Sequence, residues 1–200
     1  MQFVDVAKEQ KEKYSITKKG KYVFFIHNYS GDVTIDIDGS EIECYIYGLY
    51  IGRDQNNFKL NTIQRHNAPR STSDLLIKGV FFDESRFIYE GLIRIEKKAQ
   101  KSHAYQKNQN LIMSDKCFVD SRPFLEILAN DVFCTHGSTT GGLNEEQIYY
   151  LKTRGIEEIR ARELLIKGFA NEILDKIVQQ GIDAKISNIK DQISKIQIKD

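Results

Sequence analysis

The sequence predicts a mainly β fold over residues 1–141, followed by helices in residues 142–200. Short runs of apolar, β-branched and aromatic residues alternate with Gly, Asn, Asp and Ser, which is the pattern of strands joined by compact turns. No segment of helical length separates these runs, so alternating βαβ units are not expected. After Gly141 and Gly142 the apolar residues recur every three or four positions, which is the period of a helix.

The expected strands are short and closely spaced. They correspond to the runs 23–26, 33–37, 42–51, 75–82, 87–95, 111–113, 124–128 and 132–134. Such a series fits a β-sandwich, a barrel or a solenoid, and the unevenly spaced turns do not choose among the three. The chain has only two prolines, which fits long strand ladders because each proline removes one backbone donor.

Three helices are expected at the C-terminal end. Asn144 is suited to cap the first, because acidic residues follow it, and Gly155 is suited to end it. The second is expected over residues 157–179 and stops before Gly181. The third contains a stripe of five isoleucines at spacings of four and three, namely Ile182, Ile186, Ile189, Ile193 and Ile196. We interpret this stripe as closing the end of the strand region; the alternative is that it docks a partner protein.

The composition is that of an ordinary globular protein. The chain has 200 residues with 29 basic and 28 acidic side chains, a net charge of +1, so no global field favours nucleic acid or a membrane surface. No apolar run approaches the roughly 20 residues needed to span a bilayer. Residues 1–15 lack the apolar centre of a signal peptide. We therefore expect a cytoplasmic location, or a plastid stroma.

Enzyme signatures are missing from the sequence. It contains no phosphate-binding loop, no H-E-x-x-H, no G-x-S-x-G and no G-x-G-x-x-G, which makes a self-contained NTPase or zinc protease unexpected. The three cysteines are an odd number at wide spacing, which favours reduced thiols. Of these, Cys44 and Cys117 are interpreted as small core residues.

One pair of residues could hold a soft metal or sulfide. Cys134 and His136 are two positions apart in a strand-like run, so their side chains should project from the same face. A buried Cys next to a surface His would explain the pair without any function. Two ligands are also half of a metal site, which a second subunit could complete. The other histidines, His66 and His103, are expected to be solvated, and His27 to be a satisfied residue at a strand end.

About half of the sequence, from His66 to Phe169, resembles the SufB/SufD family of iron–sulfur cluster assembly scaffolds, and SufD more than SufB. The segments that carry the resemblance are STSDLLIKGVFFDESRFIYEGLIRI (71–95), AQKSHAYQKNQNLIMSD (99–115), RPFLEILANDVFCTHGSTTGGLNEEQIYYLKTRGI (122–156) and ARELLIKGF (161–169). The resemblance implies a right-handed parallel β-helix capped by a C-terminal α-helical domain. It therefore selects the solenoid, with a β-helix core over 1–141 and a helical domain over 142–200.

The resemblance also implies partners. Members of the family pair end to end through their β-helices, either as SufB with SufD or as two copies of one chain, and each helical domain binds one copy of the ABC-type ATPase SufC. This division of labour would explain the missing phosphate-binding loop. The expected contact with the ATPase lies in one segment, which comprises Tyr149, Tyr150, Leu151, Arg154, Gly155 and Ile156. The alternative is that Tyr150, Leu151 and Ile156 are core residues of the helices.

By this resemblance His136 is a ligand for iron or for a transient iron–sulfur cluster at a subunit interface, with Cys134 as its neighbour. SufB-like proteins instead carry His-Glu at positions 136–137, and a cysteine where Asn108 or Gln109 stands here. This chain therefore looks like the SufD partner, a non-catalytic subunit that binds no nucleotide itself. It departs from the family in being shortened at the N-terminus, and in having His103 in place of an acidic residue.

Two other functions remain open from the sequence. A metalloenzyme could bind zinc or iron through Cys134, His136 and a carboxylate such as Asp131 or Glu126. A purely structural β-solenoid could stabilise partner proteins without contacting iron.

Overall fold

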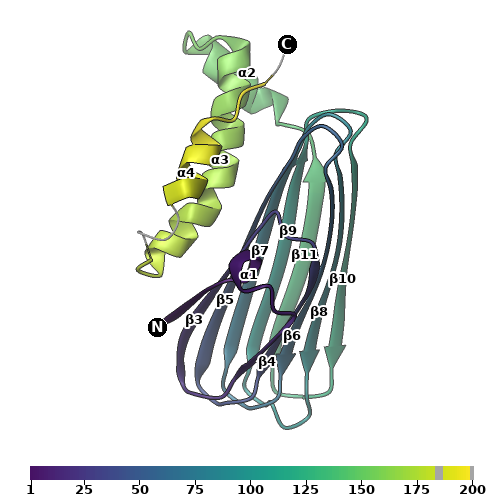
Figure 1. Cartoon of the computed structure of the whole chain (residues 1–200), viewed down its shortest axis with the longest axis vertical. Coiled ribbons are helices and arrows are strands. Elements are labelled where there is room, and N and C mark those ends of the chain that lie inside the picture. The colour runs from purple at the N-terminus through teal and green to yellow at the C-terminus, as the bar shows by residue number, and fades with distance from the viewer. Residues whose placement is uncertain (183–186, 199–200) are drawn as a thin grey trace.

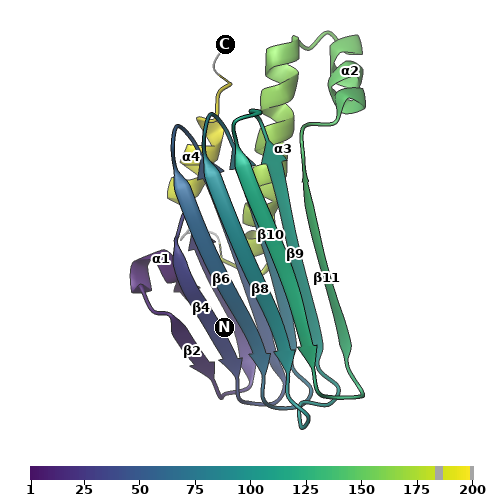
Figure 2. The same ribbon diagram turned by 90° about the vertical axis from the view of Figure 1, so that its right-hand side faces the viewer.

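A computed structural model describes residues 1–182 and 187–198. Eleven strands form two parallel sheets (Figures 1 and 2). The first sheet contains, in spatial order, β1 (Gln2–Asp5), β3 (Gly20–His27), β5 (Ile42–Gly52), β7 (Thr72–Phe81), β9 (His103–Ile112) and β11 (Phe133–Gly141). The second contains β10 (Phe118–Ile127), β8 (Arg86–Ile95), β6 (Asn57–His66), β4 (Gly31–Ile37) and β2 (Lys13–Ile16).

The chain alternates between the two sheets, and every strand pairing is parallel. This arrangement is a parallel β-helix, so the expected solenoid is confirmed and the sandwich and barrel are excluded. The strands are longer than the apolar runs that predicted them. The sequence also gave no indication of β1, β2, β6 or the short helix α1 (Val6–Glu9), and it indicated only the last residues of β9.

The strands are in register from one coil to the next. Thr72 of β7 pairs with His103 of β9, and His103 pairs with Phe133 of β11, so the steps are 103 − 72 = 31 and 133 − 103 = 30 residues. Because neighbours in register have their side chains on the same face, each position belongs to a row that continues through the sheet. The inward rows form the interior of the solenoid, and the outward rows form its two outer faces.

The interior contains both an apolar cluster and buried polar side chains. The apolar cluster extends from β1 to β8 and includes Phe24, Ile46 and Phe87. Cys44 is buried in this cluster, which confirms its interpretation as a core residue, whereas Cys117 is only partly buried and packs against the cluster. Polar side chains are also buried in the interior, and they are contributed mostly by β6 and β9: Thr62, Gln64, His66, Ser73, Gln106, Asn108 and Asn110. Because the inward residues of β6 and of most of β9 are polar, these strands lack the apolar run that would predict them from the sequence.

Three helices follow the strands, at the positions that the periodicity predicts. They are α2 (Glu145–Thr153), α3 (Glu158–Gln179) and α4 (Ser187–Ser194). Asn144 caps α2, because its side chain accepts hydrogen bonds from the backbone N–H groups of Glu146 and Gln147. No helix in the described ranges is long and apolar enough to cross a membrane.

The helices α3 and α4 cover the outer face of the first sheet over β3, β5 and β7 (Figure 1). Their buried residues, such as Ile173 and Ile177, pack against Val23, Tyr47 and Leu76. The isoleucine stripe therefore covers a sheet face, and the expectation that it closes the end of the strand region is wrong. Four of its members belong to this cluster, and Ile186 lies outside the described residues: the four are Ile182, Ile189, Ile193 and Ile196.

Two histidines differ from expectation. His66 is fully buried in the interior, and its Nε2 atom lies 2.8 Å from the Ser73 hydroxyl, so it is not a solvated residue. It points inward because it lies on the same face of β6 as Thr62 and Gln64. His27 does end a strand, but its Nε2 atom has no hydrogen-bond partner among the described residues. His103 is exposed on β9, as expected.

The buried His66 should make the stability depend on pH. Burial lowers the pKa of its imidazole to about 4, whereas an unfolded chain has a pKa of about 6.5. Between these values the unfolded chain binds more protons, so the free energy of unfolding rises with pH. From pH 5 to pH 7 the gain should be about 2 kcal/mol from this residue. Urea unfolding at a series of pH values measures it.

The matched variants are His66→Gln and His103→Gln. The first should lose most of the gain, and the second should keep it because the exposed ring of His103 has no buried environment to lose. Some dependence should remain in both, since burial also lowers the pKa of His27. An imidazole resonance of His66 that titrates near pH 6.5 in the folded protein would contradict the prediction.

Candidate functional site

The solenoid ends at β10 and β11, which are the edge strands of the two sheets (Figures 1 and 2). We call the surface formed by these two strands the open end, because no further coil covers it in the described ranges. In both strands nearly every residue is at least partly exposed, whereas the inward residues of the preceding β8 are fully buried. The edge position of β10 also accommodates Pro123, which cannot donate to a ladder on both sides.

The register places both candidate metal ligands on the inward face of β11. Cys134 pairs with Ala104, and His136 pairs with Gln106, both of which point into the interior. The two side chains therefore share one face of the strand, as their spacing predicts. Farther along the same face of β11, Thr140 accepts a hydrogen bond of 3.2 Å from the Asn110 side chain of β9. Ser138 donates one of 2.9 Å to Ser121 of β10.

Cys134 and His136 have different surroundings. Cys134 is half-buried against a small apolar cluster that includes Ile93 and Ala129. Removal of its thiol from water raises the pKa of that thiol to about 11, so the uncharged form dominates at neutral pH. The imidazole of His136 is exposed, and no hydrogen bond holds it within the described ranges. His136 is therefore available to a group that approaches the open end from outside.

Large apolar side chains are also exposed on β10, on β11 and in the turn between them. Their exposed fractions are 38–54%, and the residues are Phe118, Phe124, Leu125, Ile127, Leu128 and Phe133. Leu125 and Ile127 belong to the inward row of β10, where another coil would normally bury them. A group of exposed apolar residues beside two free strand edges is typical of a protein–protein contact.

The carboxylates proposed as further ligands do not join the pair. Glu126 lies in the outward row of β10, where its carboxylate accepts a hydrogen bond of 3.1 Å from Arg94. Asp131 lies in the turn before β11, where its backbone bonds to Gln100 and Lys101. Within the described part of the chain, no group of three or more His, Cys, Asp or Glu side chains could hold a metal ion.

The second candidate surface lies on α2 and the turn after it. Tyr149 and Tyr150 are 70% and 57% exposed, so the alternative that Tyr150 is a core residue is wrong. The guanidinium of Arg154 lies over the Tyr150 ring, 5.3 Å from its centroid, and Arg154 is exposed. Leu151 and Ile156 are only partly exposed.

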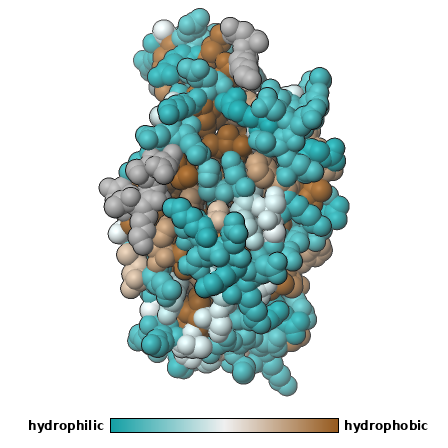
Figure 3. Space-filling model, viewed as in Figure 1, coloured by the Kyte–Doolittle hydropathy of each residue, from teal (hydrophilic) through white to brown (hydrophobic). Residues whose placement is uncertain are grey.

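A helix-ending turn fixes this surface. The N–H of Gly155 bonds to the carbonyl of Lys152, and the N–H of Ile156 bonds to that of Leu151, which is the Schellman pattern. Gly155 has φ of +81°, a backbone conformation that residues with a Cβ atom rarely adopt. On the face seen in Figure 3, apolar side chains come to the surface over α2 and α3. Exposed apolar residues of α3 include Ile159 and Leu164.

Residues 12–169 match the family model described as the SufBD core domain of the SUF system for iron–sulfur cluster assembly. The chain belongs to the SufBD family. It is 36% identical over 121 residues to the iron–sulfur cluster assembly protein SufD of Escherichia coli, a match that covers 60% of this chain and 29% of that protein. The SufD of Bacillus subtilis is 30% identical over 141 residues, with 70% and 32% covered.

A plant protein is also similar. Protein ABCI7, chloroplastic, of Arabidopsis thaliana is 32% identical over 121 residues, which are 60% of this chain and 26% of the plant protein. The matches thus span about a third or less of the length of these three relatives. The SufBD match includes β2 to β11, α2 and the first part of α3, so the open end lies inside the region that the family model matches.

Sequence reasoning located the inward pair of this SufBD chain but missed most of its surroundings. The period of two was enough to place Cys134 and His136 on one face. The exposure of Leu125 and Ile127 was not predictable, because an apolar strand residue is normally a core residue. Only the position of β10 at a sheet edge leaves these two residues uncovered.

The raised pKa of Cys134 predicts slow alkylation. At pH 7.5 the thiol should react with iodoacetamide about 100-fold more slowly than a free cysteine, because the reactive thiolate is scarce. The rate should increase about tenfold per pH unit up to pH 11. Mass spectrometry of the peptide that contains Cys134 measures the rate, and the same peptide in urea is the control. A plateau already near pH 9 would contradict the prediction.

Proposed function

We propose that this chain is a non-catalytic, SufD-like scaffold subunit of the SUF machinery. Its membership of the SufBD family supports a role in iron–sulfur cluster assembly. The observation that carries the rest is the exposed imidazole of His136, which stands in an inward row at the uncovered end of the solenoid. A side chain in that row would be buried in any other coil. Its exposure makes sense if a second subunit covers the open end.

The proposed ligand site is shared between two subunits. His136 supplies an imidazole and Cys134 can supply a thiolate, and both are ligands for iron and for iron–sulfur clusters. The iron or the nascent cluster is the cargo of this site, bound transiently. The pKa of Cys134 favours the protonated thiol in the isolated chain, so binding there would require a metal to displace the proton. His136 needs no such displacement when its ring is neutral, and we assign it the leading role.

The proposed partner at the open end is a SufB-type scaffold or a second copy of this chain. Two free strand edges and the exposed inward residues Leu125 and Ile127 supply the contact surface. A partner that stacks there would bury Leu125 and Ile127, and would enclose His136 between two protomers. Enclosure would also exclude water from a cluster that is sensitive to it.

The proposed ATPase contact is the exposed surface of α2 and its terminal turn, with a SufC-type ABC ATPase as the partner. Tyr149, Tyr150 and Arg154 form its exposed part, and Leu151, Gly155 and Ile156 shape the turn beneath them. Because α3 packs on the first sheet, a force applied to α2 would be transmitted to the solenoid. We place this activity in the cytoplasm or in a plastid stroma, the latter because one relative is named as chloroplastic.

The two other functions have less support. A metalloenzyme built by this chain alone would need a third ligand beside Cys134 and His136, but Glu126 is paired with Arg94 on the outer face. A purely structural solenoid would leave the exposure of His136 without a role.

The first test is formation of the complex. The full chain, a SufB-type scaffold and a SufC-type ATPase should elute together from a size-exclusion column. Leu125→Asp and Ile127→Asp together should release the scaffold, because a charge buried in an apolar contact is costly. Tyr149→Ala with Arg154→Ala should release only the ATPase. Separate elution of the three unmodified proteins would remove the main support for the proposal.

The second test concerns His136. His136→Ala should lower the yield of reconstituted cluster several-fold, measured by iron and sulfide content and by the visible absorption, while the complex still elutes as one peak. His103→Ala is the matched control, since it removes an exposed imidazole from the outward row of the neighbouring strand. Equal cluster yield in both variants would show that His136 is not a ligand.

A further inference from the structure

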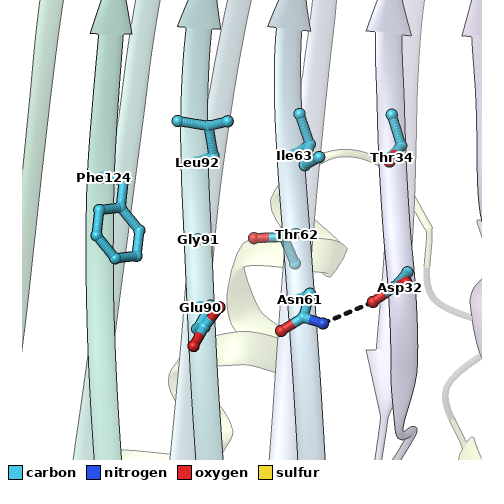
Figure 4. Close-up of a pocket in the computed structure, with 9 residues that line it drawn as sticks. All are labelled: Asp32, Thr34, Asn61, Thr62, Ile63, Glu90, Gly91, Leu92 and Phe124. Carbon is cyan, nitrogen blue, oxygen red and sulfur yellow. Dashed lines mark hydrogen bonds between the residues drawn. The ribbon is translucent and has the colours of Figure 1, made fainter.

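A cavity of about 400 Å³ opens on the outer face of the second sheet and reaches the edge strand β10 at Phe124. It crosses β4, β6, β8 and β10, and Figure 4 shows the nine residues that line it. Cavities of this size bind small organic molecules when an apolar surface is combined with a few polar groups that fix orientation.

The apolar part is one outward row. Ile63, Leu92 and Phe124 are neighbours in register on three adjacent strands, and they lie side by side in Figure 4. Adjacent strands are about 4.8 Å apart, so the row is about 10 Å long. Phe124 is 50% exposed, which leaves its ring available as one wall of the cavity. The row matches the length of a short alkyl chain or of one aromatic ring with a linker.

The polar part is the adjacent outward row, which runs from Asp32 through Asn61 and Glu90 to Arg122 of β10. Asn61 lies between Asp32 and Glu90, and its Nδ2 donates a hydrogen bond of 2.6 Å to the Asp32 carboxylate (Figure 4). An ionised carboxylate can only accept, so this bond fixes the orientation of the amide. The Oδ1 atom of Asn61 consequently faces Glu90. It is shielded from solvent and has no hydrogen-bond partner among the described residues.

The charges of this row do not cancel. Arg122 approaches Glu90 at 3.3 Å, but the same guanidinium also contacts Asp120 through two of its nitrogens. Asp32 forms no ion pair within the described ranges. The row thus presents two carboxylates and an unsatisfied amide oxygen to the cavity, opposed by one shared guanidinium. A further cationic donor would satisfy the amide oxygen and balance the excess negative charge, since a buried acceptor without a partner is costly.

We propose that this cavity binds a small organic cation, with an apolar body along Ile63, Leu92 and Phe124 and a primary ammonium group between Glu90 and the Oδ1 atom of Asn61. The ammonium would donate to both acceptors, and Asp32 would add to the attraction through Asn61. This site is separate from the proposed assembly function, because Cys134, His136, Leu125 and Ile127 do not line the cavity.

The test is a titration of the full, ¹⁵N-labelled chain with 3-phenylpropylammonium, followed by backbone amide shifts. Shifts should concentrate on residues 61–63 and 90–92, with a dissociation constant in the low millimolar range that is usual for a ligand of this size. The matched probe is 3-phenylpropionate, which has the same body and the opposite charge, and it should bind at least several-fold more weakly.

Variants separate the two parts of the site. Glu90→Gln and Phe124→Ala should each weaken binding of the amine several-fold, and both are partly exposed positions whose replacement leaves the core intact. Asp175→Asn, an exposed residue of α3, is the control and should bind as the unmodified chain does. Equal binding of amine and acid, shifts centred on Leu125 and Ile127, or no shift at about 20 mM amine would each overturn the proposal.

Discussion

The structure depends on the stacking of coils in register. Each inner coil provides its neighbour with hydrogen-bond partners for the strand edge and with side chains that bury the inward residues. The last coil has neither on its outer side. Leu125, Ile127 and His136 are inward residues by register and exposed residues by position. The open end is thus a consequence of the same periodic constraint that holds the interior together, and the proposed shared ligand site rests on it.

The outer faces have different roles for the same reason. The first sheet carries apolar outward rows on β3, β5 and β7, and α3 and α4 bury them. One cation is buried with them: Lys78 is 2% exposed, pairs with Glu172, and lies 4.0 Å from the centroid of the Phe169 ring. Its burial lowers the pKa of the ammonium, and these contacts compensate for the loss of water. The helices are therefore fixed to the solenoid by both apolar and charged contacts.

None of the described helices covers the second sheet, and ion pairs occupy much of its outer face. Asp36 with Arg65, and Glu126 with Arg94, bridge adjacent strands in one outward row. The next outward row is apolar at Ile63, Leu92 and Phe124, the row beyond it contains Asp32, Asn61 and Glu90, and the two rows line the cavity. A polar residue at an outward position is unremarkable in a sequence. Here the only cationic donor on a neighbouring strand among the described contacts of this row, Arg122, is shared between Glu90 and Asp120, and the amide oxygen of Asn61 has no partner among the described residues.

The sequence by itself determined the strand-to-helix change at Gly141 and Gly142, the cap at Asn144, and the common face of Cys134 and His136, because these follow from spacing along one segment. It could not reveal β6 or most of β9, whose inward residues such as Gln64 and Asn108 are polar. Local hydrophobicity marks a strand only where its buried face is apolar. The burial of His66, the face covered by the isoleucine stripe and the exposure of the last coil were decided by tertiary structure, since each depends on which neighbour stacks against a segment.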